Sequence, residues 1–238
     1  MNLFANMFDK IYTENVALTG MTEELFSIYV NKLLENNNSV LIVTSSLVEA
    51  NNLYHSISNY TDNVYLFPMD DFLTSEAMAI SPDLMVNRLE TLKEISGKDK
   101  SVVITNLMGY LRFLPFKEEF LKARIQLKKD MEIAPKELVG KLINLGYERT
   151  SLVTKTGEIG VRGFVIDVFL VGEDYPIRIE FFGDFIESIR YFDPNNQKSL
   201  AGINSVNVYP YTEVFSLDKD IPLDERKSKY LPFYTNVG

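Results

Sequence analysis

Apolar positions in the first half of the chain follow two alternating patterns. Short apolar runs, such as SVLIVTS at 39–45, predict buried strands, and the segments between them have apolar residues at helical spacing. Strands are predicted over 16–20, 39–45, 63–67 and 101–105, and helices over 22–36, 47–59 and 83–95. The continuous apolar run at 39–45 is typical of a parallel strand covered on both faces. Because strands alternate with helices, we expect a parallel α/β sheet with right-handed crossovers.

The pattern changes after about residue 124. Residues 134–148 predict a helix, and Gly146 is well placed to end it. Strands are predicted over 124–133, 149–155, 160–170, 176–182, 185–192 and 204–209. Gly183 and Asp184 give a turn signal between two of these strands. We therefore expect a second, α+β domain with an antiparallel sheet.

The segment IRIEFF at 177–182 places two kinds of side chain on opposite faces of one strand. Its apolar face consists of Ile177, Ile179 and Phe181. Its other face consists of Arg178, Glu180 and Phe182. This second row has two interpretations. It is either the solvated face of an antiparallel sheet or part of a protein interface, where arginine and aromatic residues are the usual anchors.

Composition limits the class of protein. The chain has 238 residues, enough for one large or two modest domains, and it contains no cysteine. It has no run of about 18 apolar residues that would span a membrane, and its N-terminal segment lacks the apolar core of a secretory signal. Together with the absence of cysteine, these features predict a cytoplasmic protein that does not contact the membrane.

The charge favours a protein partner over a nucleic acid. The formal net charge is −9, whereas proteins that bind DNA through its phosphates usually have a basic excess or a basic face. The only basic candidate is KARIQLKK at 122–129, which we interpret as a solvated strand end. We expect no direct contact with nucleic acid.

The predicted strand at 16–20 precedes a helix, which is where a phosphate-binding P-loop would lie. A P-loop needs a glycine-rich turn, a lysine for the phosphates and a hydroxyl for magnesium. The turn here has Thr19 and Gly20, followed by Glu23 and Glu24 in the first helical turn. These carboxylates would stabilise the positive end of the helix and repel a phosphate. We expect an acidic helix start and no cofactor.

Other candidates for chemistry are weak. His55, the only histidine, falls on a predicted surface helix. Asp70 and Asp71 follow the strand at 63–67, at the sheet end where α/β proteins often bind ligands. No histidine or further carboxylate supports a metal site there, and the chain has no nucleophile elbow. We therefore expect no catalytic residues, no metal and no enzyme activity.

The segment GEIGVRGFVIDVFLVGEDYPIRIEFFGDFIESIRYFDPNNQKSL at 157–200 carries a family resemblance. It resembles the second domain shared by the UvrB excision-repair protein and Mfd, the bacterial transcription-repair coupling factors. Three features favour the second family. The P-loop of UvrB is missing, the loop at 69–82 lacks the aromatic DNA-binding hairpin of UvrB, and SPDLMVNRLETL at 81–92 resembles the coupling-factor pattern.

The resemblance covers residues 16 to about 212 and implies a domain organisation. It makes 1–130 a UvrB-like domain 1a with a degenerate Walker A motif and 131–212 the UvrA-binding domain 2. Residues 213–238 would be a linker or the start of a missing domain 1b. The implied fold is α/β, with a parallel-sheet, degenerate P-loop NTPase-like domain followed by a smaller α+β domain that has an antiparallel sheet.

In this family, domain 2 recruits UvrA, the damage-recognition ATPase of nucleotide excision repair, at stalled RNA polymerase. Motif matching places the recruiting residues on Arg162, Arg178 and Phe182, and Glu180 lies in the same row. Arg190 ranks lower because the sequence does not fix the strand register. The resemblance implies that polymerase binding, DNA binding and ATP-driven translocation belong to modules outside these residues. The alternatives are a UvrB-type helicase fragment that binds ATP and damaged DNA, and a structural scaffold.

Overall fold

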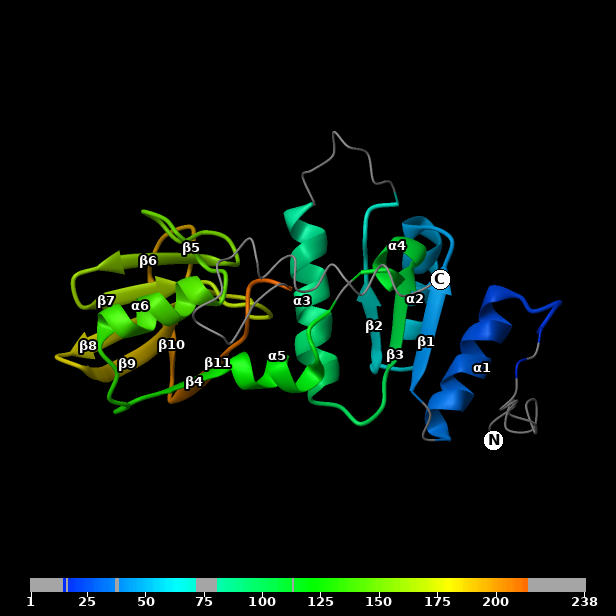
Figure 1. Ribbon diagram of the computed structural model, residues 1–238, viewed down its shortest axis with the longest axis horizontal. Coiled ribbons are helices and arrows are strands. Elements are labelled where there is room, and N and C mark those ends of the chain that lie inside the picture. The colour runs from blue at the N-terminus through cyan, green and yellow to red at the C-terminus, as the bar shows by residue number, and fades with distance from the viewer. Residues whose placement is uncertain (1–14, 16, 37–38, 72–80, 113, 214–238) are drawn as a thin grey trace. The chain divides into compact units, whose positions relative to one another are not determined.

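The computed structural model describes residues 15, 17–36, 39–71, 81–112 and 114–213 (Figure 1). The chain divides into two compact units, unit 1 within Met1–Arg112 and unit 2 within Phe113–Gly238. Both parallel and antiparallel sheets are present, as the sequence predicted. Among the described residues, no helix is long and apolar enough to cross a membrane.

Unit 1 is a three-stranded parallel sheet with helices. Its elements are α1 (Glu23–Glu35), β1 (Val40–Thr44), α2 (Leu47–Ser58), β2 (Val64–Phe67), α3 (Pro82–Ser96), β3 (Val102–Asn106) and α4 (Leu107–Tyr110). The strand order is β1-β3-β2. The core joins α1 and α2 to the strands, through Val30, Leu34, Ala50, Ile57, Val64, Val102 and Ile104. The predicted helices and three of the four predicted strands are thus confirmed within a few residues.

Two expectations about the strands of unit 1 are wrong. Residues 17–20 form no strand: they are exposed, and Gly20 turns the chain with a φ of +76° just before the helix cap Thr22. The strand at 39–45 is not covered on both faces. Leu41 and Val43 of β1 are 56% and 43% exposed, because β1 lies at the edge of the sheet.

Unit 2 is built around a six-stranded sheet with the order β10-β9-β8-β7-β6-β5. Its elements are α5 (Lys117–Ala123), β4 (Ile125–Lys128), α6 (Pro135–Asn144), β5 (Glu148–Arg149), β6 (Glu158–Arg162), β7 (Val165–Val168), β8 (Ile177–Phe182), β9 (Phe185–Phe192), β10 (Ser199–Ile203) and β11 (Ser205–Val208). Neighbours from β6 to β10 are antiparallel, and β5 is parallel to β6. The predicted antiparallel sheet is confirmed from β6 to β10, but the strand predicted over 149–155 is wrong, because only the two residues of β5 pair there.

The details of unit 2 differ from the sequence prediction at its turns and edges. The single strand predicted over 160–170 is the hairpin β6–β7, because Gly163 takes a φ of +62° and reverses the chain. The strand predicted over 204–209 is β11, which pairs with β4 outside the main sheet. Strand β10 was not predicted. Gly146 follows α6 with a φ of +94°, which agrees with its predicted role in ending that helix.

Candidate protein-interaction surface

Strand β8 has the two faces that its sequence predicted. Ile177 and Ile179 are fully buried and Phe181 is 6% exposed, so this face belongs to the core. Arg178 and Glu180 are half-buried, and Phe182 is 78% exposed. An aromatic side chain so exposed on a regular strand contributes little to the core of its own chain. The second face is therefore available for contact with another molecule.

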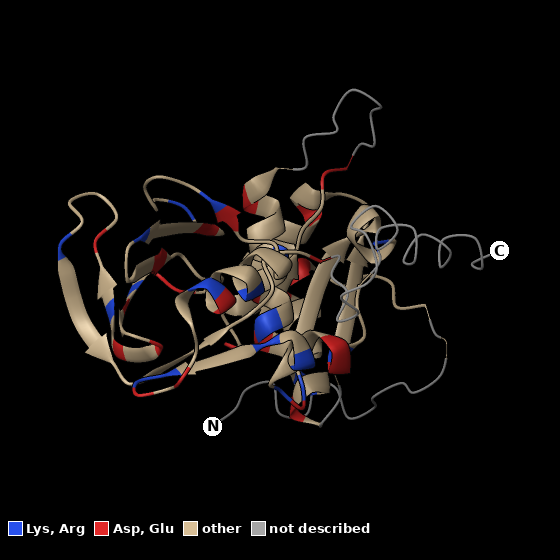
Figure 2. Cartoon of the chain, turned by 60° about the vertical axis from the view of Figure 1, so that its left-hand side comes forward, with Lys and Arg blue, Asp and Glu red and all other residues tan. Residues whose placement is uncertain are grey.

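The register of the sheet gives this row its neighbours. Arg178 lies opposite Asp167 of β7 on one side and Arg190 of β9 on the other, and Glu180 lies opposite Ser188. Residues directly opposite in an antiparallel pair point to the same face. The polar face of unit 2 is thus continuous over β6, β7, β8 and β9. Figure 2 shows basic and acidic positions interspersed over these strands.

Asp167 links the two predicted arginines. It is only 3% exposed. Its Oδ1 accepts a hydrogen bond from Arg178 Nε at 2.7 Å, and its Oδ2 accepts one from Arg178 Nη2 at 2.9 Å. Arg162 Nη2 also donates to Asp167 Oδ2. One buried carboxylate therefore holds one guanidinium in a bidentate pair and a second by one bond. Sequence reasoning missed Asp167. The only signal was a carboxylate between two apolar positions, Ile166 and Val168.

Arg178 is fixed by more than its ion pair. Its guanidinium lies over the ring of Phe192 at 4.6 Å from the centroid, and it donates to the backbone carbonyl and the side-chain oxygen of Gln197, each at 3.4 Å. Its side chain is 15% exposed. The hydrogen bonds to Asp167 raise the pKa of Arg178 above its ordinary value. Arg178 is thus a charged group that is held by several partners.

The other predicted residues are more accessible. The side chain of Arg162 is 53% exposed. Glu180 pairs with Arg190, and both side chains are 32% exposed. Ser188 Oγ donates to Glu180 Oε2 at 2.9 Å. The structure therefore brings all four predicted residues and Arg190 onto one face, where Arg162 and Phe182 are the most exposed.

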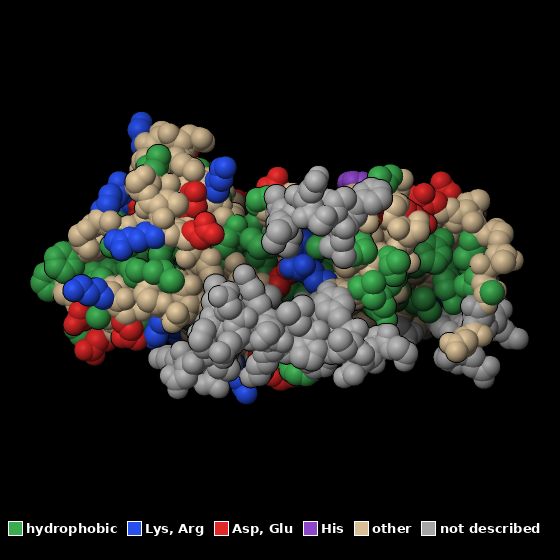
Figure 3. Space-filling model, turned by 45° about the horizontal axis from the view of Figure 1, so that its top comes forward, with side chains coloured by type: hydrophobic (Ala, Val, Ile, Leu, Met, Phe, Trp, Pro, Cys, Tyr) green, Lys and Arg blue, Asp and Glu red, His purple; other side chains and the backbone are tan. Residues whose placement is uncertain are grey.

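Three exposed phenylalanines lie on adjacent turns at one end of this sheet. Phe164 follows Gly163 in the β6–β7 turn, and Phe182 and Phe185 flank the β8–β9 turn as a cross-strand pair. They are 63%, 78% and 49% exposed. A hydrogen bond of 2.9 Å from Phe181 N to Phe164 O joins the two turns. Figure 3 shows apolar side chains at this end, with basic side chains beside them.

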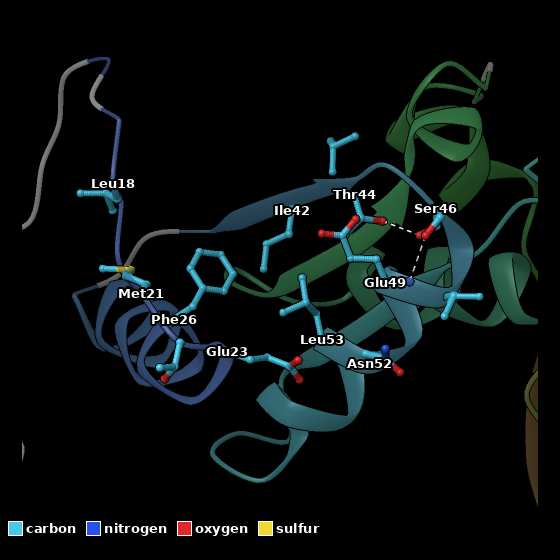
Figure 4. A pocket seen from close by; sticks show the side chains of 13 residues that line it. Leu18, Met21, Glu23, Phe26, Ile42, Thr44, Ser46, Glu49, Asn52 and Leu53 are labelled. Atoms are coloured by element: carbon cyan, nitrogen blue, oxygen red, sulfur yellow. Dashed lines mark hydrogen bonds between the residues drawn. The ribbon is translucent and has the colours of Figure 1, made fainter.

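The acidic helix start of unit 1 lies beside an open pocket (Figure 4). Thr22 caps α1 by accepting from Leu25 N at 3.3 Å, and Glu23 and Glu24 lie in the first turn. Backbone hydrogen bonding, and then the Thr22 side chain, lower the pKa of Glu24. The pocket lining includes Glu23 and Glu49 and is otherwise apolar or neutral: Leu18, Met21, Thr22, Phe26, Ile42, Val43, Thr44, Ser46, Val48, Asn52 and Leu53. An acidic lining disfavours phosphate. Thr19 and Gly20 precede this turn and are exposed.

Two further candidates of unit 1, Asp71 and His55, have structural partners. Asp71 accepts from Leu47 N with both carboxylate oxygens, at 2.8 and 3.0 Å, so it satisfies the first N–H of α2, next to the N-cap Ser46. Asn106 Nδ2 donates to Asp71 Oδ1 at 2.6 Å. His55 is exposed on α2 and meets the ring of Tyr54 edge-on. Within the described part of the chain, no group of three or more His, Cys, Asp and Glu residues could hold a metal.

Comparison with known proteins first identifies a domain within unit 2. Residues 125–214, from β4 to just past β11, match the family model of the UvrB interaction domain. The chain is 31% identical over 98% of its length to the transcription-repair-coupling factor of Staphylococcus epidermidis. It is 33% identical over 86% of its length to that of Staphylococcus haemolyticus, and 27% identical over 83% to that of Bacillus subtilis.

These similarities confirm the predicted resemblance. The chain is similar over nearly its whole length to part of the transcription-repair-coupling factors, and its residues 125–214 match the UvrB interaction domain. It spans about a fifth of the length of these relatives, namely 20% of the Staphylococcus epidermidis protein, 18% of the Staphylococcus haemolyticus protein and 17% of the Bacillus subtilis protein.

Proposed function

We propose that this chain is the UvrA-recruiting, non-catalytic part of a transcription-repair coupling factor. In nucleotide excision repair it would bring UvrA to RNA polymerase that has stalled at DNA damage. The observation that carries the proposal is the match of residues 125–214 to the UvrB interaction domain. That match contains the face formed by Arg162, Arg178, Glu180 and Phe182.

The chemistry of this face suits recognition of a protein. Arg162 has a half-exposed side chain, whose guanidinium can donate to a carboxylate of UvrA while it also donates to Asp167. Phe182 is exposed enough to be buried in an apolar pocket of the partner. Glu180 and Arg190 form a polar rim in which charges of both signs can select the partner.

Several observations support a non-catalytic role. Asp71, the carboxylate best placed for chemistry in unit 1, has both oxygens engaged by the N-terminus of α2. Among the residues that the structure describes, the pocket beside the acidic start of α1 is lined by two glutamates and by no lysine or arginine. Contacts with RNA polymerase and DNA, and ATP-driven translocation, are proposed to reside in other parts of the longer relatives.

Calorimetric titration of purified UvrA with this chain tests the proposal. We expect saturable binding, and no heat from magnesium-ATP titrated into the chain alone. Failure of the folded chain to bind UvrA from a compatible bacterium would contradict the proposed function. Binding of ATP together with a DNA mobility shift at low salt would instead support a helicase fragment.

A further inference from the structure

Asp167 is a buried carboxylate in the middle of the polar face. Its neighbours in β7, Ile166 and Val168, are fully buried, and Asp167 itself is 3% exposed. A carboxylate withdrawn from water to this degree is tolerated only when it is paired and hydrogen-bonded. Both of its oxygens are engaged by arginines, since Oδ1 accepts from Arg178 and Oδ2 accepts from Arg178 and Arg162.

Because Asp167 is buried, its side chain can make little direct contact with a partner. The side chain of Asp167 is 4% exposed, whereas that of Arg162 is 53% exposed. A partner that approaches this face therefore meets Arg162 and Phe182, and Asp167 lies beneath the guanidinium groups. The two arginines carry like charges, and one shared carboxylate brings them together.

We infer that Asp167 is the positioning residue of the recruiting surface: it holds Arg162 and Arg178 in the orientation that the protein partner reads. The inference rests on the proposed function and names a residue to which neither the sequence motif nor the family match assigns a role. Asp167 acts through the arginines, chiefly through the exposed Arg162. Arg178 is the inner support, braced by the ring of Phe192 and by Gln197.

Replacement of Asp167 distinguishes two ways in which it could affect partner binding: by positioning the arginines or by changing the charge of the face. Two arginines and one carboxylate give the trio a formal charge of about +1 at neutral pH. Asp167→Asn keeps the size of the side chain and raises the charge of the face. If the face attracted an acidic partner through charge alone, this variant would bind more tightly. If the orientation of the arginines matters, it binds more weakly despite its greater positive charge.

The experiment measures the affinity for purified UvrA of the wild type, Asp167→Asn, Arg162→Ala and the double variant, each shown by circular dichroism to be folded. The matched control is Glu137→Gln, which removes an ion-paired carboxylate from α6, outside the sheet. We expect Asp167→Asn to weaken binding at least tenfold and Glu137→Gln to leave it within twofold. In the Arg162→Ala background, Asp167→Asn should weaken binding less than threefold, because the effects of substitutions at coupled residues are not additive.

Arg178→Lys gives a second route if Asp167→Asn does not fold. Lysine keeps the positive charge but cannot form the bidentate pair with Asp167. We expect at least tenfold weaker binding of this variant as well. Unchanged or tighter binding of folded Asp167→Asn, or of Arg178→Lys where the first does not fold, would overturn the inference while the proposed function stands. Absence of binding by the wild type would contradict both the proposed function and this inference.

Discussion

Asp167 and Arg178 form a bidentate ion pair across neighbouring strands, with N–O distances of 2.7 and 2.9 Å. The two residues are direct partners in the β7–β8 register, and the carboxylate is almost completely buried. The pair anchors a polar face that ends in the exposed phenylalanines of the β6–β7 and β8–β9 turns. It therefore links the packing of the sheet to the surface that we propose for UvrA.

Phe182→Ala should weaken binding to UvrA without reducing the stability of the fold. The side chain is 78% exposed, so the free energy of unfolding should change by less than about 0.5 kcal/mol. Binding to UvrA should weaken by more than about 1.4 kcal/mol, which is tenfold, because an exposed aromatic anchor is buried in the complex. Urea unfolding and calorimetry measure the two quantities.

The matched control for this substitution is Tyr175→Ala. Tyr175 is an exposed aromatic residue, 47% accessible, that precedes the opposite end of β8. We expect it to leave the affinity for UvrA unchanged. Equal losses from Phe182→Ala and Tyr175→Ala would show that the turn is not the contact point.

Arg162→Ala should weaken binding and also reduce its dependence on salt. The exposed guanidinium is screened by ions, and the Debye length falls from about 10 Å at 0.1 M to about 3 Å at 1 M ionic strength. The affinity of the wild type should therefore decrease as salt is added, and the slope should be smaller for the variant. Parallel salt dependences of the two proteins would argue that Arg162 makes no charged contact with UvrA.

Arg178→Ala should destabilise unit 2. It removes the principal partner of a buried carboxylate, and loss of one member of a buried ion pair costs about 3 kcal/mol. Lys141→Ala is the control, because it breaks the exposed pair with Glu137, whose contribution is below about 1 kcal/mol. Denaturant unfolding of both variants tests this difference, and similar stabilities would mean that Arg178 is not a structural support.

The chain should lose stability at alkaline pH, in part through Tyr191. Burial, and then a hydrogen bond to the Glu173 carboxylate, raise the pKa of Tyr191 from 10.0 to about 12. A raised folded-state pKa gives stability that is complete below pH 10 and lost as the pH rises toward 12. Tyr191→Phe should flatten the dependence of the unfolding free energy on pH in this window. An unchanged slope would exclude Tyr191 as a source of that dependence.

The sequence predicted what depends on local pattern. The period-two alternation over 177–182 placed Arg178, Glu180 and Phe182 on one face, and the structure has that face. Asp167 was missed because its role depends on the register between β7 and β8, which no local pattern fixes. Arg190 was ranked low for the same reason, yet it lies opposite Arg178 and pairs with Glu180.

The errors in the fold have equally specific causes. The run over 160–170 has Val161 before Gly163 and Phe164, Val165 and Ile166 after it. This pattern predicts one strand, although the positive φ of that glycine makes a hairpin. VALTG has the composition of a strand, but residues 17–20 have no pairing partner in the three-stranded sheet of unit 1. In both segments, the pairing between strands determines the secondary structure, and composition alone does not predict it.

Amide hydrogen exchange of this chain, with and without UvrA, tests the central claim most directly. The proposed recruitment predicts slower exchange on UvrA binding in the β6–β7 turn at 162–165 and in the β8–β9 turn at 182–185. It predicts no change in α2 of unit 1. Unchanged exchange in both turns under conditions where UvrA is in excess, or protection confined to unit 1, would contradict the assignment of this face as the recruiting surface.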